Sequence, residues 1–258
     1  LNQSYRVPRE VQKIAQWWVK KLRRREEKEY LPKDVEGEVK RLRQATWKYP
    51  EPALIDAETY LSQGKSVMFL TTCSYMLDPL KSSLKEAGLP FHNPYRKSRR
   101  DWNPLTSANG ITSAERLLAY LRPSEEVWGD KNRLWTYDDL HKWLGVIKAK
   151  GILKRGVKSN IAEWKHEEEV LDLLQLLDYF EEDALEKALE LDVGWFYERL
   201  VLGKRKGMEF PINVLEKRGA EVLRQEPKIV VGTIHSVKGG EADVVYLFPD
   251  LSLSGMRE

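Results

Sequence analysis

The sequence has little cysteine and little histidine, and it has no long apolar run. Its single cysteine, Cys73, excludes an internal disulfide framework and a multi-cysteine zinc site. The 4 histidines are scattered without the spacing of metal ligands, so no metal site is expected. No apolar stretch approaches the roughly 20 residues that span a bilayer. With 41% hydrophobic and 32% charged residues, the 258-residue chain is predicted to be a soluble, cytoplasmic, globular protein without membrane contact.

Positive charge is concentrated in the first part of the chain, although the net charge is only +3. Residues 1–110 carry 21 Lys and Arg against 13 Asp and Glu, whereas residues 111–222 carry 18 against 22. Residues 223–258 are nearly neutral, with 4 against 5. A basic first part favours a polyanionic partner, but a solvated basic helix face has the same composition.

Apolar patterns predict a parallel α/β layer near both ends of the chain. Short apolar runs, which are typical of buried strands, occur at 66–71, 89–92, 228–231 and 243–248. Apolar residues at helical spacing predict helices over 8–29, 53–61 and 78–87. Strand, helix and strand joined by short loops indicate a parallel sheet.

The middle of the chain is predicted to be an all-α insertion. Helices are expected over 112–121, 137–149, 163–180, 184–190 and 213–223. Thr136 and Asp139 have the spacing of a capping box. The predicted domains are therefore one α/β domain formed by residues 1–110 and 223–258, and a helical insertion over 111–222. Prolines, Gly110 and a basic cluster predict a linker over 94–110.

Gly64-Lys65-Ser66 has the ending of a phosphate-binding loop. The full pattern needs an earlier glycine, and Thr59 stands at that position. Such a loop also follows a strand and opens a helix, so that N–H groups face the phosphate, whereas this tripeptide precedes a strand. An ordinary turn is therefore predicted here.

The segment after the third apolar run combines features of a nucleotide site. It reads Thr233-Ile234-His235-Ser236-Val237-Lys238-Gly239-Gly240-Glu241 and leads into another apolar run. Polar residues at strand ends of an open α/β sheet are where ligands usually bind, and paired glycines let a backbone approach a phosphate closely. A simple turn with an exposed lysine and glutamate is the alternative.

Three stretches together resemble the UvrD/Rep-type superfamily 1 DNA helicases. The Thr233–Glu241 segment resembles motif V of that family, and Leu1-Asn2-Gln3-Ser4-Tyr5-Arg6 resembles motif IV, with Ser4 in place of the usual Asn. Residues 115–122, ERLLAYLR, resemble the start of the family's inserted 2B subdomain. The resemblance implies a partial RecA-like (P-loop NTPase-type) sheet domain, 2A, interrupted by a helical 2B insertion.

The resemblance also implies residue roles on the ATP side. Tyr5 would stack on the adenine, and Arg6 would contact the γ-phosphate as the catalytic residue. Glu241 would bind the ribose hydroxyl. Gly239 and Gly240 would form the loop that lies between the nucleotide and the DNA, and Gly240 stands where the family often has a bulkier apolar residue.

On the DNA side, the resemblance implies that Thr233, His235 and Lys238 line the single-stranded DNA track. The chain contains neither a complete phosphate-binding loop nor a pair of acidic residues that end a strand. It is therefore expected to be part of a longer protein, in which a first RecA-like domain supplies the Mg²⁺ ligands and the arginine-bearing motif VI follows. Alone it is not expected to hydrolyse ATP.

The predicted function is thus one part of an ATP-dependent 3′–5′ DNA helicase or translocase of DNA repair or a related process. Its partners would be ATP with Mg²⁺, single-stranded DNA, a duplex junction and the first RecA-like domain. The alternative is a non-catalytic DNA-binding or protein-docking module derived from a helicase. Further DNA contacts are expected at Arg96, Lys97, Arg99, Arg100 and at Lys204-Arg205-Lys206, whereas most of the 9 tryptophans are expected in the core.

Overall fold

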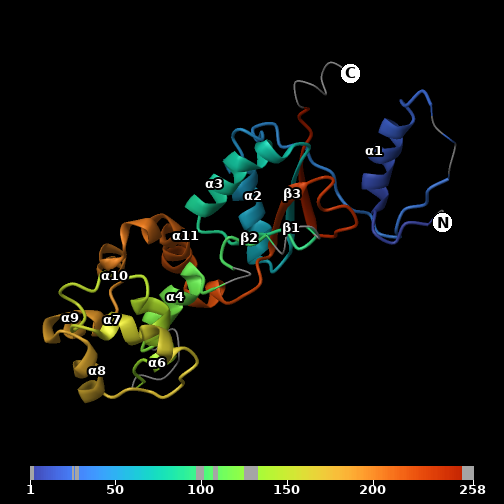
Figure 1. Cartoon of the computed structure of the whole chain (residues 1–258). Helices are drawn as coiled ribbons and strands as arrows, with labels where there is room; N and C mark the ends of the chain where they lie inside the picture. Colours follow the sequence, from blue (N-terminus) through green and yellow to red (C-terminus); the bar gives the residue numbers. More distant parts are fainter. Residues whose placement is uncertain are drawn as a thin grey trace.

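A four-stranded, all-parallel sheet lies at the centre of the chain (Figure 1). The computed structural model describes residues 3–24, 26, 29–96, 102–106, 110–124 and 133–251. Strands β1 (Val67–Thr71), β2 (Phe91–His92), β3 (Ile229–Thr233) and β4 (Val244–Phe248) take the order β2-β3-β1-β4. All four lie within or beside the predicted apolar runs, and the α/β class is confirmed.

Helices α2 (Glu51–Ser62) and α3 (Leu77–Glu86) cover one face of the sheet (Figure 1). Phe69 of β1 stacks on Tyr246 of β4, and the Tyr246 hydroxyl donates a hydrogen bond of 2.6 Å to Asp56 of α2. A short 3₁₀ turn, Ser74–Met76, precedes α3, and Gly88 follows it with a φ of +64° that suits a helix end. Both helices were predicted at these positions, and the structure confirms them.

The opposite face of the sheet carries only a small apolar cluster of Met68, Val230 and Val237. On β4 the outward side chains Val245 and Leu247 remain 52% and 54% exposed. Parallel sheets normally have both faces covered. Here the described residues leave this face of β4 partly exposed.

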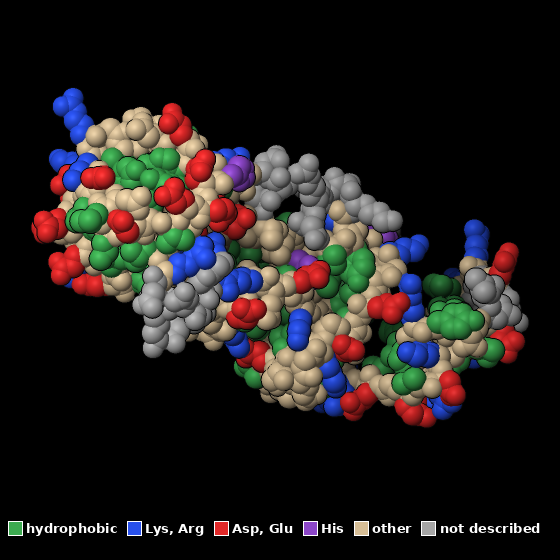
Figure 2. Space-filling view, turned by 90° about the horizontal axis from the view of Figure 1, so that it is seen from below, with side chains coloured by type: hydrophobic (Ala, Val, Ile, Leu, Met, Phe, Trp, Pro, Cys, Tyr) green, Lys and Arg blue, Asp and Glu red, His purple; other side chains and the backbone are tan. Residues whose placement is uncertain are grey.

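Helix α1 (Arg9–Val19) stands apart from the sheet (Figure 1). The predicted helix over 8–29 is therefore too long, because the described residues after Val19 form turns and extended chain. The apolar side chains of α1 are exposed and gather on the surface at that end of the molecule (Figure 2). Helices are stabilised mainly by burying an apolar face, and in α1 only Gln12 is buried, which explains the early end.

A helical unit, residues 110–124 and 133–223, follows β2 and precedes β3. Its helices are α4 (Ser113–Tyr120), α6 (Tyr137–Leu144), α7 (Val157–Asn160), α8 (Leu173–Tyr179), α9 (Glu182–Leu189), α10 (Val193–Arg199) and α11 (Leu202–Arg218). Two 3₁₀ segments, Ile161–Trp164 and Ala220–Leu223, complete it. Thr136 and Asp139 form the predicted capping box of α6.

The boundaries of three predicted helices in this unit are wrong. The helix expected over 137–149 ends at Leu144, because Gly145 follows and the chain turns there. The helix expected over 163–180 begins only at Leu173, because Asp172 and Gln175 form a capping box there and the chain before it pairs with the segment around Trp135. Helix α10 was not predicted. Helix α11 begins eleven residues before the predicted start at 213, since Gly203, Gly207 and Pro211 conceal its pattern.

Aromatic side chains form the core of the helical unit. Tyr120, Trp135, Trp143, Phe180 and Phe196 are all fully buried, with ring centroids 4.6–6.5 Å apart. The Trp135 Nε1–H donates a hydrogen bond of 2.8 Å to the carbonyl of Tyr120, the last residue of α4. The prediction that tryptophans are mainly core residues is confirmed for these two positions.

The described residues of the predicted linker over 94–110 form turns and irregular chain, and two of them also pack against the core. Trp102 lies 5.4 Å from Phe91 between ring centroids, and Leu105 is buried in the main core. Lys97, Arg99 and Arg100, which were expected to contact DNA, lie outside the described residues, as does Trp128. None of the described helices has the length and apolar composition needed to cross a membrane.

Acid is expected to weaken the helical unit through Asp138. Burial alone would raise the pKa of this carboxyl, but hydrogen bonds from the Lys142 ammonium and the His166 N–H outweigh it and hold the pKa below its ordinary value. Because the folded pKa is lowered, the stabilisation is present above an unfolded pKa of about 3.9 and is lost as pH falls through the folded value.

We therefore expect Asp138→Asn to lower the free energy of unfolding by at most about 1 kcal/mol at pH 7, since the pair is partly solvated. The difference from the parent should shrink towards zero below about pH 3. Urea titrations at both pH values measure it, and a difference that persists undiminished at low pH would contradict the assignment.

Candidate nucleotide and nucleic-acid site

The candidate site lies where β3 ends. A loop that we call the site loop, Thr233–Glu241, leaves β3 and returns to β4 on the far side of β1. The return is fixed at Asp243, whose carboxylate accepts hydrogen bonds of 2.8 and 2.7 Å from the N–H and hydroxyl of Ser66. These bonds lower the pKa of Asp243, so at neutral pH the carboxylate stays ionised and keeps both hydrogen bonds to Ser66.

The structure brings Arg6 to the site loop from the other end of the chain. The Arg6 Nε lies 2.5 Å from Glu241 Oε1, and the Arg6 Nη1–H donates a hydrogen bond of 2.9 Å to the Gly239 carbonyl. Both charged side chains are more than half exposed, at 57% and 63%. Three residues predicted for one site, from the two ends of the sequence, are therefore in direct contact.

Ser4 holds the turn that presents Tyr5 and Arg6. Its buried hydroxyl accepts hydrogen bonds from the N–H groups of Arg6 (3.3 Å) and Val7 (3.0 Å), while its own N–H donates to the Leu31 carbonyl. Serine hydroxyls bond the backbone of the following residues at turns in this way. Ser4, which stands in place of the usual Asn, therefore still provides a side chain that accepts hydrogen bonds from the backbone at this turn.

The side chains of Tyr5 and of the residues predicted to contact DNA are largely accessible to solvent. The Tyr5 ring is 75% exposed and thus accessible to a planar ligand. His235 and Lys238 are exposed on the site loop, and Thr233 is half-buried with its hydroxyl accepting a hydrogen bond from the Ser236 N–H. The structure brings Arg6 into contact with Gly239 and Glu241, whereas no such contact links Arg6 to Thr233 or His235.

The two glycines of the site loop have different reasons to be glycine. Gly239 has a φ of +88°, a conformation that side chains strongly disfavour. At Gly240 the reason is space, because a Cβ there would lie 2.7 Å from the ring of Tyr95. Both positions therefore let the loop backbone pass close to neighbouring groups.

Sequence reasoning missed two residues that contact the site loop. Asn93, directly after β2, donates hydrogen bonds of 3.1 Å to the Val231 carbonyl and the Ser236 hydroxyl. Tyr95 packs on Gly240, and its hydroxyl accepts the Glu241 N–H at 3.4 Å. The signal was present, because a polar residue at the carboxyl end of a parallel strand belongs to the ligand-binding edge.

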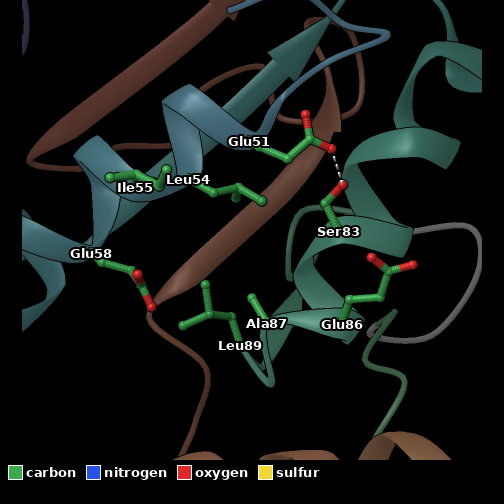
Figure 3. Close-up of a pocket in the computed structure, with 8 residues that line it drawn as sticks. All are labelled: Glu51, Leu54, Ile55, Glu58, Ser83, Glu86, Ala87 and Leu89. Carbon is green, nitrogen blue, oxygen red and sulfur yellow. Dashed lines mark hydrogen bonds between the residues drawn. The ribbon is translucent and has the colours of Figure 1, made fainter.

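Two other candidate features do not resemble binding sites. Gly64 has a φ of +80° in a turn before β1, and the Lys65 N–H is bonded to the Tyr60 carbonyl, so the predicted turn is confirmed. A shallow pocket of about 230 Å³ lies between α2 and α3 (Figure 3). Two of the three carboxylates that line it have protein partners, since Glu51 accepts from Ser83 and Glu58 pairs with Arg218.

Among the described residues, no three His, Cys, Asp or Glu side chains gather into a group that would hold a metal ion. No protein-family model matches the chain, and no curated protein matches it either. Function is therefore inferred from the site itself.

Proposed function

We propose that this chain supplies one wall of an ATP cleft and part of the single-stranded DNA track of a 3′–5′ DNA helicase or translocase. The observation that carries the proposal is the contact of Arg6 with Gly239 and Glu241. Two motifs that resemble those of the UvrD/Rep-type helicases, 235 positions apart at Arg6 and Glu241, meet on the loop that leaves the carboxyl end of β3. That end of a parallel strand is the usual ligand site of open α/β folds, and it suits a RecA-like 2A domain.

The ATP side of the site has the chemistry that a nucleotide requires. The Arg6 guanidinium is planar and largely exposed, so it is able to exchange its bond to Glu241 for bonds to phosphate oxygens. Glu241, once released, offers its carboxylate to ribose hydroxyls, and the exposed Tyr5 ring offers a face for the base. The ion pair then acts as a resting state that nucleotide binding opens.

The other half of the cleft belongs to a partner domain. A P-loop domain would provide the phosphate-binding loop and the Mg²⁺ ligands, and ATP with Mg²⁺ would bridge the two domains. In this arrangement the site loop connects the Arg6 end, which senses the nucleotide, to the Thr233 end. Closure of the cleft would then change the position of Thr233 and His235 along the DNA backbone.

Single-stranded DNA binding tests the DNA half of the proposal. We expect this chain to bind labelled oligo-dT with an affinity that falls with salt, because each neutralised phosphate releases a counterion. Lys238→Ala should weaken binding and reduce the slope of log K against log salt by about 0.7, the value for one phosphate on a single strand.

Fluorescence anisotropy at several salt concentrations measures both quantities. Lys187→Ala is the matched control, because Lys187 is also an exposed lysine and pairs with Glu190 on the helical unit. An unchanged slope for Lys238→Ala, or an equal loss for Lys187→Ala, would remove Lys238 from the track.

A docking module is the second candidate function, and α1 favours it. Trp17, Trp18 and Leu22 are 54–60% exposed. Hydrophobic side chains gather on the surface at the end of the molecule where α1 lies (Figure 2). Exposed apolar patches of this kind mark protein contacts. The absence of any DNA binding at low salt, with the fold intact, would make docking the leading function.

A further inference from the structure

The segment that follows β2 lies directly against the site loop. Strand β2, at one edge of the described sheet, pairs in parallel with β3, with Phe91 opposite Ile229 and His92 opposite Val230, so it ends three residues before β3 does. Asn93 is the first residue after β2, and it is only 1% exposed. A polar side chain buried at this edge must find its partners in the neighbouring loop.

Asn93 joins three parts of the molecule. Its Nδ2 donates to the Val231 carbonyl on β3 and to the Ser236 hydroxyl in the first half of the site loop, each at 3.1 Å. Its Oδ1 accepts the Tyr95 N–H at 3.2 Å, and its backbone N–H donates to the Trp102 carbonyl at 2.9 Å. The side chain leaves no room for larger residues nearby, since a Cβ on Gly232 would lie 2.6 Å from its Nδ2.

Tyr95 contacts the second half of the same loop. The flat ring lies against Gly240, where a Cβ would lie 2.7 Å from Cε2 and Cζ. The hydroxyl accepts the N–H of Glu241 at 3.4 Å. Asn93 and Tyr95 therefore support the two halves of the loop, and Lys238 lies between the supported positions.

We propose that Asn93 and Tyr95 are positioning residues that fix the site loop, so that Glu241 faces Arg6 while Thr233 keeps its place at the end of β3. This role in ATP and DNA binding rests on the proposed function, whereas the support of the loop does not. The Asn93–Trp102 bond also ties the loop to the chain that enters the helical unit.

Hydrogen exchange in the 258-residue chain tests the support directly. In Tyr95→Ala and Asn93→Ala we expect amides of residues 234–241 to exchange about tenfold faster, because a packed ring or a bonded partner is removed. Tyr95→Phe should change exchange by less than about threefold, since it loses only a long hydrogen bond. Exchange is read by mass spectrometry of peptides that cover the site loop.

Two matched controls separate loop support from general destabilisation. Asn213 bonds the carbonyls of Lys85 and Glu86 on α3, so Asn213→Ala removes a similarly bonded asparagine elsewhere. Tyr49 is exposed and far along the chain from these contacts, so Tyr49→Ala removes an unrelated ring. If the controls raise exchange in 234–241 as much as the test variants do, the proposal is wrong.

A pair of substitutions keeps the test decisive even where Asn93→Ala fails to fold. Gly240→Ala places a methyl group against the Tyr95 ring, and we expect faster loop exchange and weaker binding of oligo-dT. Adding Tyr95→Ala to Gly240→Ala removes the clash, so the double variant should be less impaired than the two single effects combined. Strict additivity of the two effects would show that Tyr95 does not contact Gly240 and would overturn the proposal.

The functional readout distinguishes failure of this inference from failure of the proposed function. If the loop exchanges faster in the test variants but the parent chain binds no oligo-dT, the loop support stands and the DNA role is wrong. If the parent binds oligo-dT but Tyr95→Ala neither loosens the loop nor weakens binding, the positioning role is wrong. If the DNA role and the positioning role are both correct, Tyr95→Phe should keep most of the affinity for oligo-dT that Tyr95→Ala loses.

Discussion

Arg6→Ala, in a protein that joins this chain to a P-loop domain, should lower the ATPase rate by about 10³-fold or more. An arginine that stabilises the charge on a transferring phosphoryl group contributes about 10³–10⁵ to the rate in related phosphoryl-transfer sites. Binding of single-stranded DNA should stay within about twofold of the parent, because Arg6 contacts Gly239 and Glu241 rather than the Thr233 end of the loop. Steady-state ATPase with saturating oligo-dT, and anisotropy without ATP, measure the two quantities.

The controls for Arg6 come from the same segment. Arg9 is also exposed and pairs with Asp34 and Glu36, so Arg9→Ala should leave the ATPase nearly unchanged. Arg6→Lys keeps the charge but not the planar fork, and it should recover only part of the rate. Neither change should cost more than about 1 kcal/mol of folding free energy, since the pairs are exposed. An Arg6→Ala protein that turns over ATP at the parent rate would rule out the assignment.

Trp135→Ala should have the largest effect on stability, a loss of about 3–5 kcal/mol, as is usual when a buried aromatic is truncated. Trp135 is fully buried among Tyr120, Trp143 and Phe180. Its loss also removes the hydrogen bond to the Tyr120 carbonyl, which would remain buried at the end of α4. Urea unfolding followed by far-ultraviolet circular dichroism measures the change, and Trp17→Ala, at an exposed position, should change stability by less than about 0.5 kcal/mol.

A comparison of two phenylalanine variants sharpens this prediction. The indole Nε1 of Trp143 is buried and has no hydrogen-bond partner among the described residues, whereas that of Trp135 is bonded. Trp143→Phe should therefore lower the free energy of unfolding less than Trp135→Phe does. The first change removes a buried N–H that has no partner within the described part of the chain, whereas the second leaves the buried Tyr120 carbonyl without its hydrogen bond. Equal losses would show that ring volume alone decides the stability of this core.

The strands were predictable because the interior strands of a parallel sheet are buried on both faces and therefore form continuous apolar runs. Helices were less predictable wherever packing overrides local pattern. The glycines and Pro211 of α11 conceal a helix that its partners stabilise, while α1 lacks buried apolar contacts and ends early. Capping residues such as Asp172 set starts that apolar spacing alone placed too early.

The candidate site was predictable in its chemistry but not in its full geometry. Sequence motifs identified Arg6, Gly239 and Glu241, yet only the folded chain brings positions 6 and 241 within 2.5 Å. The position of Asn93 and Tyr95 after an apolar run was their only sequence signal, and it is weak because a two-residue strand has almost no periodic pattern. Their importance depends on tertiary contacts with Ser236 and Gly240, which no local pattern encodes.

The open outer face of β4 has a consequence for handling the protein. β4 lies at one edge of the sheet that the described residues form, and its sequence, Val244–Phe248, carries no charge, which is the composition of segments that nucleate β-aggregates. Asp243 before it and Pro249-Asp250 after it interrupt this segment on both sides, as charges and proline do at aggregation-prone strands. The Asp243 carboxylate, which bonds the Ser66 N–H and hydroxyl, thus also places a negative charge at the start of this strand, and such charges oppose edge-to-edge association of chains.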